Sequence, residues 1–129
     1  MKIGTLSCID RDTQQPVTIV GLSGPPDEVR AIYAKIAPLL PSDYIFAPPE
    51  LDPAYWRGRD DPRFRKPMFF RGDSMECVEP RLYQCARQLN IVVDGMTIAD
   101  YDTKKKERPC ASCRANANAL LEGIEVISR

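Results

Sequence analysis

Histidine is absent from this chain of 129 residues. That absence excludes every mechanism in which an imidazole activates a serine or a cysteine, and every metal site built on histidine. A transition metal bound here would take most of its ligands from thiolates. The number of cysteines, 5, is odd for a disulfide framework, and their spacing fits metal binding better. They are Cys8, Cys77, Cys85, Cys110 and Cys113.

The sequence also lacks an apolar run near the roughly 20 residues that a membrane-spanning helix needs, and its start lacks the layout of a signal peptide. The 18 basic residues balance 18 acidic ones, so net charge indicates neither a nucleic-acid nor a membrane partner. The 43% hydrophobic and 28% charged content is typical of a globular protein. We expect one domain over residues 1–129 and no membrane contact.

Strands and helices are predicted to alternate along the chain. Two runs rich in Ile, Val, Leu and Thr, at 2–9 and 17–23, flank a polar stretch and predict a β-hairpin. Proline and acidic residues then start a helix that Pro38 should end or kink. A second helix is indicated by an apolar stripe of Val78, Leu82, Cys85, Ala86 and Leu89. The rest is expected to be a strand at 96–102, a helix at 111–122 that Gly123 terminates, and a strand at 124–127.

This alternation favours an α/β layered domain. It is interrupted by an insertion at about 41–73, because most of the 12 prolines lie between Pro38 and Pro67 and no periodicity survives there. A loop of that length in a compact domain usually serves function. Four strands are counted; a fifth is either missing or supplied by residues 42–47 or 91–94.

Two cysteine motifs stand at predicted helix starts. Cys110 and Cys113 are spaced so that both sulfurs can face one ion, and a helix N-terminus favours their thiolate form. Alone, such a pair equally fits a redox couple or half of a structural zinc site. Cys77, in Cys77-Val78-Glu79-Pro80, would add a third thiolate if the two helix starts face each other. The fourth tetrahedral position would then be left for water, as in catalytic zinc sites.

Glu79 follows Cys77 by two residues and would point toward that water without binding the metal. A closed structural site would need one more ligand. Cys8 and Cys85 are instead expected to be small core residues.

The run Cys-x-Glu followed by Pro-Cys-x-x-Cys resembles the zinc signature of the cytidine deaminase superfamily, in its three-cysteine version. The resemblance covers residues 75–128 and, loosely, the opening hairpin. It implies a cytidine deaminase-like α/β/α domain with a central mixed sheet and the zinc site between two helix N-termini. It also implies Zn²⁺ bound by Cys77, Cys110 and Cys113, with Glu79 as general acid and base. Hydrolysis at C4 of a cytosine, or C6 of an adenine, would release ammonia.

Free-nucleoside enzymes of this superfamily carry an Asn-x-Glu that grips the ribose, and this chain has none. Its Gly-x-Ser-Gly turn at 21–24 and its Cys-x-Glu-Pro look more like deaminase domains at the C-terminal ends of bacterial polymorphic toxins. Several of those act on cytosines in nucleic acid. This resemblance implies a toxin domain, secreted or delivered for interbacterial competition, that acts in the cytoplasm. An immunity protein that blocks the pocket is then an expected partner.

Aromatic and basic residues support a nucleic-acid partner, because unstacked bases and phosphates suit them. The expected contacts with single-stranded DNA, duplex DNA or RNA are Ser23, Trp56, Arg57, Arg59, Phe69, Phe70, Arg71, Lys104, Lys105 and Lys106. The same aromatics could instead pin the insertion to the core, and a lysine run is often only solvated surface. Two alternatives stay open: a free nucleoside or base deaminase, and a zinc-stabilised binding module without catalysis.

Overall fold

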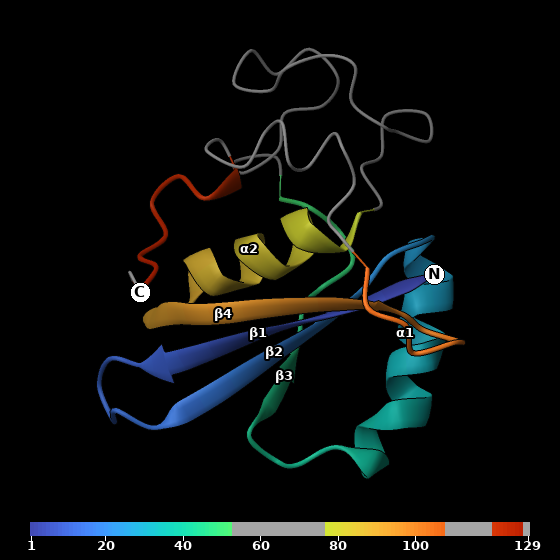
Figure 1. The fold of residues 1–129 in the computed structure, drawn as a ribbon, viewed down its shortest axis with the longest axis horizontal. Helices are drawn as coiled ribbons and strands as arrows, with labels where there is room; N and C mark the ends of the chain where they lie inside the picture. The colour runs from blue at the N-terminus through green and yellow to red at the C-terminus, as the bar shows by residue number, and fades with distance from the viewer. Residues whose placement is uncertain (53–76, 108–119, 128–129) are drawn as a thin grey trace.

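The structure is a computed structural model that describes residues 1–52, 77–107 and 120–127. Within these residues the chain forms an α/β fold with a mixed four-stranded sheet and two α-helices (Figure 1). The elements in chain order are β1 (Lys2–Asp10), β2 (Pro16–Leu22), α1 (Pro26–Ile36), the 3₁₀-helix η1 (Ala37–Leu39), β3 (Tyr44–Phe46), α2 (Val78–Gln88) and β4 (Ile91–Asp100).

The strand order in the sheet is β3-β2-β1-β4. Strand β1 pairs antiparallel with both β2 and β4, whereas the short β3 joins β2 in parallel. The expected hairpin is therefore present, with Ile3 opposite Leu22 and Cys8 opposite Val17. The pairing of β1 with β4 shifts between Ser7 and Cys8, where a bulge interrupts the register.

The expected strands at the end of the chain need correction. Residues 42–47 do contribute a strand, β3, but residues 91–94 form no separate one, because they continue into β4. The strand expected at 96–102 therefore starts earlier and ends at Asp100, where a tight turn begins. Instead of a regular final strand at 124–127, the described residues show a single parallel bridge between Val93 and Val126.

The outer edge of β4 receives two returning segments. Near its start, the amide of Val93 donates to Glu125 O at 2.9 Å and the amide of Ile127 donates to Val93 O at 2.8 Å. Near its end, Lys106 pairs antiparallel with Ala99. The sheet thus gains short additions on the side away from β1.

Two turns share one local structure. Asp10 and Asp100 each end a strand, and one carboxylate oxygen of each accepts the backbone amides two and three residues on. Four residues after each aspartate the backbone is left-handed, with φ 59° at Gln14 and 63° at Lys104. The repeated motif Asp-x-Asp-Thr explains why both strands reverse direction where they do, since aspartate readily forms such side-chain turns.

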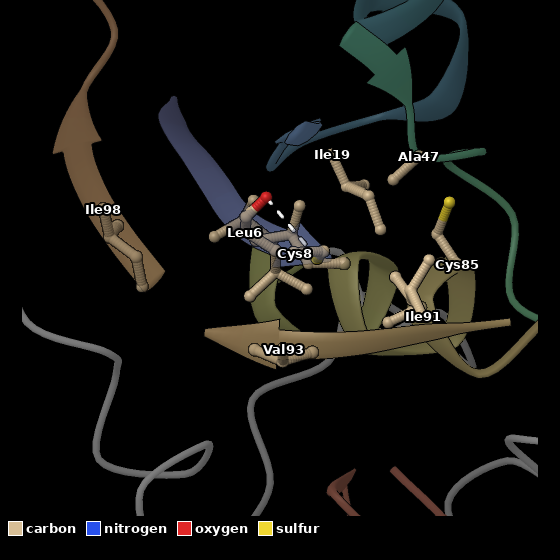
Figure 2. Packing of buried hydrophobic residues seen from close by; sticks show 11 residues of the cluster. Leu6, Cys8, Ile19, Ala47, Cys85, Ile91, Val93 and Ile98 are labelled. Atoms are coloured by element: carbon tan, nitrogen blue, oxygen red, sulfur yellow. Dashed lines mark hydrogen bonds between the residues drawn. The ribbon is translucent and has the colours of Figure 1, made fainter. Parts of the chain in front are cut away.

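Helix α2 packs on one face of the sheet and forms the main core with it. Its apolar side faces alternate residues of β1, β2 and β4, as the period of two in a strand requires (Figure 2). The cluster comprises Leu6, Cys8, Ile19, Ala47, Val78, Leu82, Cys85, Ala86, Ile91, Val93 and Ile98. Of the expected stripe only Leu89 is wrong: it caps the helix and is 38% exposed, because α2 ends at Gln88.

Two glycines let α2 approach the sheet closely. A Cβ at Gly21 would lie 2.9 Å from Leu82 Cδ2 and 3.2 Å from Val78 Cγ2. A Cβ at Gly4 would meet the same two side chains, at 2.9 and 3.1 Å. The first turns of α2 therefore rest on the start of β1 and the end of β2.

Replacing Gly21 with alanine is expected to destabilise the protein by about 1–2 kcal/mol, because overpacking a tight core forces side chains and backbone to shift. The matched control is Gly95→Ala on β4, since a Cβ there meets nothing within 4 Å. That change should be neutral or slightly stabilising. Urea unfolding measures both; equal midpoints for the two variants would contradict the close approach of α2.

The opposite face of the sheet is covered at one end by α1. Leu22, Val29 and Tyr33 form a second buried cluster, and the Tyr33 and Phe46 rings lie with centroids 4.5 Å apart. The helix ends as expected before Pro38, which lies in η1. Helices on both faces of the sheet give the described part of the chain an α/β/α layering.

The helix expected at 111–122 lies mostly outside the described residues. At its end, Gly123 has the left-handed φ of 77° that favours glycine after a helix. In the part of the chain that the structure describes, no helix is both long and apolar enough to span a membrane.

Candidate active site

The first turn of α2 is buried on every side. Cys77 precedes the helix in an extended conformation and its side chain makes no capping hydrogen bond. Residues 78–82 are all buried, although a surface helix normally exposes one face. Because the first amides of a helix have no partner within it and carry partial positive charge, a buried helix start favours an anionic or strongly polar group.

Glu79 is the unusual residue of this turn. It is only 2% exposed, and its Oε1 has no hydrogen-bond partner among the residues the structure describes. A buried carboxylate oxygen without a partner costs free energy, and in native proteins it calls for a catalytic role or an additional bound group. Cys77, two residues earlier, has a half-buried side chain. An acceptor-rich pair at a buried helix start fits the chemistry of a bound cation with its water.

The segment that leads toward Cys110 runs beside this helix start. The amide of Glu107 donates to Ile98 O at 2.9 Å, and Ile98 is paired with Gly4, over which Val78 packs. The Glu107 carboxylate also lies 3.4 Å from Lys2 Nζ at the start of β1. Glu107, the last described residue before Cys110, therefore lies at this end of the sheet.

The joining of Cys77 with Cys110 and Cys113 stays a prediction, because the latter two lie outside the described residues. Among the residues that are described, no three Cys, Asp or Glu side chains gather to hold a metal ion. Cys8 and Cys85 lie in the core, as expected.

Burial sets the chemistry of the two core thiols. Desolvation raises the pKa of Cys8 to about 12 and that of Cys85 to about 11, against an ordinary value of 9.0. Both remain protonated at neutral pH and act as small apolar side chains.

The raised pKa values predict a loss of stability in alkali. Below pH 9.0 the thiols are neutral in both the folded and the unfolded state, so their contribution is fully present. As the pH rises from 9.0 toward about 11, only the unfolded state ionises and the free energy of unfolding falls. In urea titrations, the difference in free energy of unfolding between the wild type and Cys8→Ala should therefore narrow over that interval. A constant difference would contradict an ionisable, buried Cys8.

Ser23 lies at the same end of the sheet, in the turn between β2 and α1. Its amide donates to Lys2 O at 2.9 Å, and its Oγ accepts the Lys2 amide at 2.7 Å. The hydroxyl can still donate one hydrogen bond, because it is used here as an acceptor. Ser23, one of the residues expected to contact the substrate, thus lies next to the start of β1, on which the first turns of α2 pack.

The three lysines predicted to contact nucleic acid are exposed but differ in setting. Lys104 bonds to Tyr101 O and lies over the Tyr101 ring, with Nζ 4.3 Å from the centroid. Lys105 closes the turn by accepting the Asp100 amide, and Lys106 pairs with β4. The other expected contacts, namely Trp56, Arg57, Arg59, Phe69, Phe70 and Arg71, lie outside the described residues.

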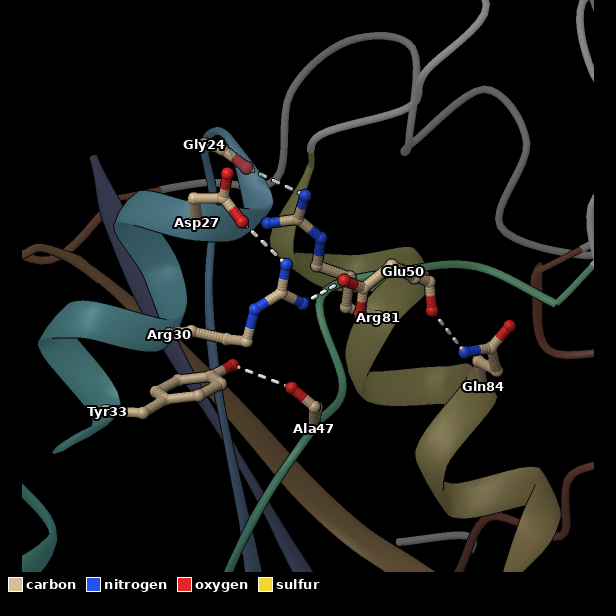
Figure 3. Close-up of polar contacts among 8 residues, drawn as sticks. All are labelled: Gly24, Asp27, Arg30, Tyr33, Ala47, Glu50, Arg81 and Gln84. Atoms are coloured by element: carbon tan, nitrogen blue, oxygen red, sulfur yellow. Dashed lines mark hydrogen bonds and ion pairs between the residues drawn. The ribbon is translucent and has the colours of Figure 1, made fainter.

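Sequence reasoning missed two polar residues of α2, Arg81 and Gln84, which are buried. The Gln84 amide donates to Glu50 O at 3.0 Å and accepts the Asp52 amide, so it attaches the beginning of the insertion to α2 (Figure 3). The insertion returns to the same helix at Cys77. The two residues are three positions apart in the sequence, and this spacing, which puts both polar side chains on one side of an otherwise apolar helix, could have indicated them.

No family model, curated protein or solved structure matches this chain. Function is therefore inferred from the residues and their geometry.

Proposed function

We propose that this chain is a zinc-dependent hydrolytic deaminase of the cytidine deaminase-like class that acts on cytosine in DNA or RNA. The observation that carries the proposal is the Glu79 carboxylate, which is buried without a described partner beside the Cys77 thiol at the start of α2. In the proposed site, Cys77, Cys110 and Cys113 hold the zinc and Glu79 moves protons.

The fold supports this class at the level of architecture. In the described residues, α2 packs on one face of a mixed sheet and begins at the end of the sheet where β1 starts and where Glu107 bonds to Ile98. The finer identity as a cytidine deaminase-like domain is part of the proposal.

Glu79 has the environment that general acid–base catalysis requires. A zinc ion bound by the three thiolates would act as a Lewis acid and lower the pKa of a water molecule toward about 7. Glu79 would accept one proton of the attacking water and transfer it to the ring nitrogen, and would then carry the proton of the new C4 hydroxyl to the leaving amine. A C–O bond forms at C4 and the C–N bond breaks, so cytosine plus water gives uracil plus ammonia.

As the substrate, we favour cytosine within a strand over free cytidine, because the chain lacks the Asn-x-Glu that binds the ribose and has basic and aromatic residues in its insertion. The base must leave any duplex to reach a buried carboxylate, which costs least in single strands. Because its motifs resemble those of toxin domains, we further propose that this domain is delivered as part of a larger protein and is inhibited by an immunity protein.

The direct test is incubation of the zinc-loaded protein with single-stranded DNA, duplex DNA, RNA and free cytidine, followed by mass or sequencing readout of C-to-U change. We expect conversion in at least one nucleic acid and the fastest conversion in single strands. Conversion of free cytidine alone would identify a nucleoside deaminase. Zinc binding without ammonia release from any cytosine or adenine substrate would overturn catalysis and leave a zinc-stabilised binding module.

A further inference from the structure

Arg81 is a fully buried arginine that bonds to two backbone carbonyls. It is 0% exposed, and its Nη1 donates a 2.7 Å hydrogen bond to Leu22 O. Its Nη2 donates a second bond of 2.7 Å to Gly24 O (Figure 3). Burying a guanidinium is costly unless its donors are satisfied in good geometry. These two bonds therefore define where the chain leaving β2 must lie relative to α2.

The turn at residues 22–24 is held from three sides. Arg81 on α2 donates to the carbonyls of the residues before and after Ser23. On β1, the Lys2 carbonyl accepts the Ser23 amide and the Lys2 amide donates to Ser23 Oγ. From α1, the Tyr33 hydroxyl accepts the Leu22 amide at 3.3 Å and donates to Ala47 O at 2.8 Å. The Ser23 hydroxyl accepts one of these bonds, and a hydroxyl that accepts can also donate one.

The position of Arg81 relates this turn to the proposed site. Arg81 follows Glu79 by two residues and Cys77 by four, and residues four apart lie on the same side of a helix. The helix turn that presents Cys77 and Glu79 is thus the one that holds the backbone around Ser23.

We propose that Arg81 is a positioning residue: it holds the turn at residues 22–24 against the start of α2, so that Ser23 forms a preset wall of the substrate pocket and donates a hydrogen bond to the substrate. The catalytic part of this inference rests on the proposed deaminase function, whereas the mechanical part does not. Pre-positioning of this kind matters because a misplacement of about 1 Å can reduce rate about 100-fold.

The test compares Arg81→Lys and Arg81→Met with Arg30→Gln. Arg30 is a matched control, since it is an arginine on the neighbouring helix that bonds to Asp27 and Glu50 at the surface. Hydrogen exchange is followed in the peptide that covers residues 22–24 and in a reference peptide from β4. Zinc content, kcat and KM are measured on the same preparations.

We expect exchange at residues 22–24 to rise at least about tenfold in Arg81→Met, less in Arg81→Lys, and not at all in Arg30→Gln, because lysine keeps one donor group for the carbonyls. Zinc content should stay at the wild-type level. We expect kcat/KM to fall roughly 10- to 100-fold in Arg81→Met, with partial rescue in Arg81→Lys. Ser23→Ala should lower kcat/KM about tenfold without changing zinc content.

Wild-type exchange at residues 22–24 in both Arg81 variants would overturn the proposal, as would loosening of the turn and of β4 to the same degree. Wild-type kinetics in a variant with a loosened turn would also overturn it. If the wild-type protein deaminates nothing, the proposed function fails, but the exchange experiment still decides whether Arg81 positions the turn.

Discussion

Replacing Glu79 with glutamine is expected to reduce deamination at least 1000-fold while leaving zinc content unchanged. Glutamine has nearly the same shape and fills the same buried volume, but it cannot accept and return a proton. General acid–base catalysis by a positioned side chain contributes roughly 10²–10⁴-fold, and here one carboxylate serves several proton transfers.

The same substitution should not destabilise the fold. Glutamine can place its amide nitrogen where Glu79 Oε1 lies, and that oxygen has no hydrogen-bond partner among the described residues, so no hydrogen bond of Oε1 is lost. Thermal unfolding should therefore stay at or slightly above the wild-type midpoint, because a neutral amide costs less to bury than a carboxylate. Glu28→Gln, at an exposed position on α1, is the matched control and should keep full activity.

Ammonia release and zinc content are measured together for both variants. An active Glu79→Gln enzyme would show that Glu79 moves no proton. A variant that instead unfolds would show that the carboxylate has a structural role. Either result contradicts the mechanism proposed here.

Replacing Cys77 with alanine is expected to weaken zinc binding more than 100-fold and to abolish activity with it. Loss of a supporting residue that only orients a metal ligand already costs about 10–100-fold in affinity, and loss of a ligand itself should exceed that. Since metal binding and folding are coupled, the melting temperature of the wild type should fall on chelation, whereas that of Cys77→Ala should not respond to zinc.

Cys85→Ala provides the contrast for Cys77→Ala. Cys85 lies in the core, so its removal should lower stability through lost packing yet leave zinc stoichiometry unchanged. Metal analysis after dialysis and thermal melts with and without chelator measure both effects. Wild-type zinc affinity in Cys77→Ala would exclude Cys77 as a ligand and leave the Cys110 and Cys113 pair as a separate site.

Local sequence patterns predicted most elements of the described chain. The opening hairpin, α1 with its end before Pro38, and the apolar face of α2 each follow from the periodicity of neighbouring residues, which depends little on the rest of the protein. The Cys-x-Glu motif at the start of α2 was likewise visible, because its two residues are close together in the sequence. Its expected partners, Cys110 and Cys113, were also visible, although their placement stays a prediction.

Boundaries and burial could not be predicted in the same way. Leu89 fits the helical stripe but is exposed because α2 ends before it. Residues 91–94 fit a separate strand but continue into β4, since pairing with β1 extends across both parts. The repeated Asp-x-Asp-Thr motif could have placed the end of β4 at Asp100, because the same side-chain turn ends β1.

The sequence by itself determined the succession of helices and strands and the residues available for metal chemistry, because both depend on side-chain identity over a few neighbouring positions. Only the tertiary structure decided that Glu79 is buried with an oxygen lacking a described partner, that Gly4 and Gly21 admit α2 close to the sheet, and that Arg81 holds the turn around Ser23. These features join residues far apart in the chain. Burial and hydrogen bonding at such positions are set by packing between elements, which no local pattern contains.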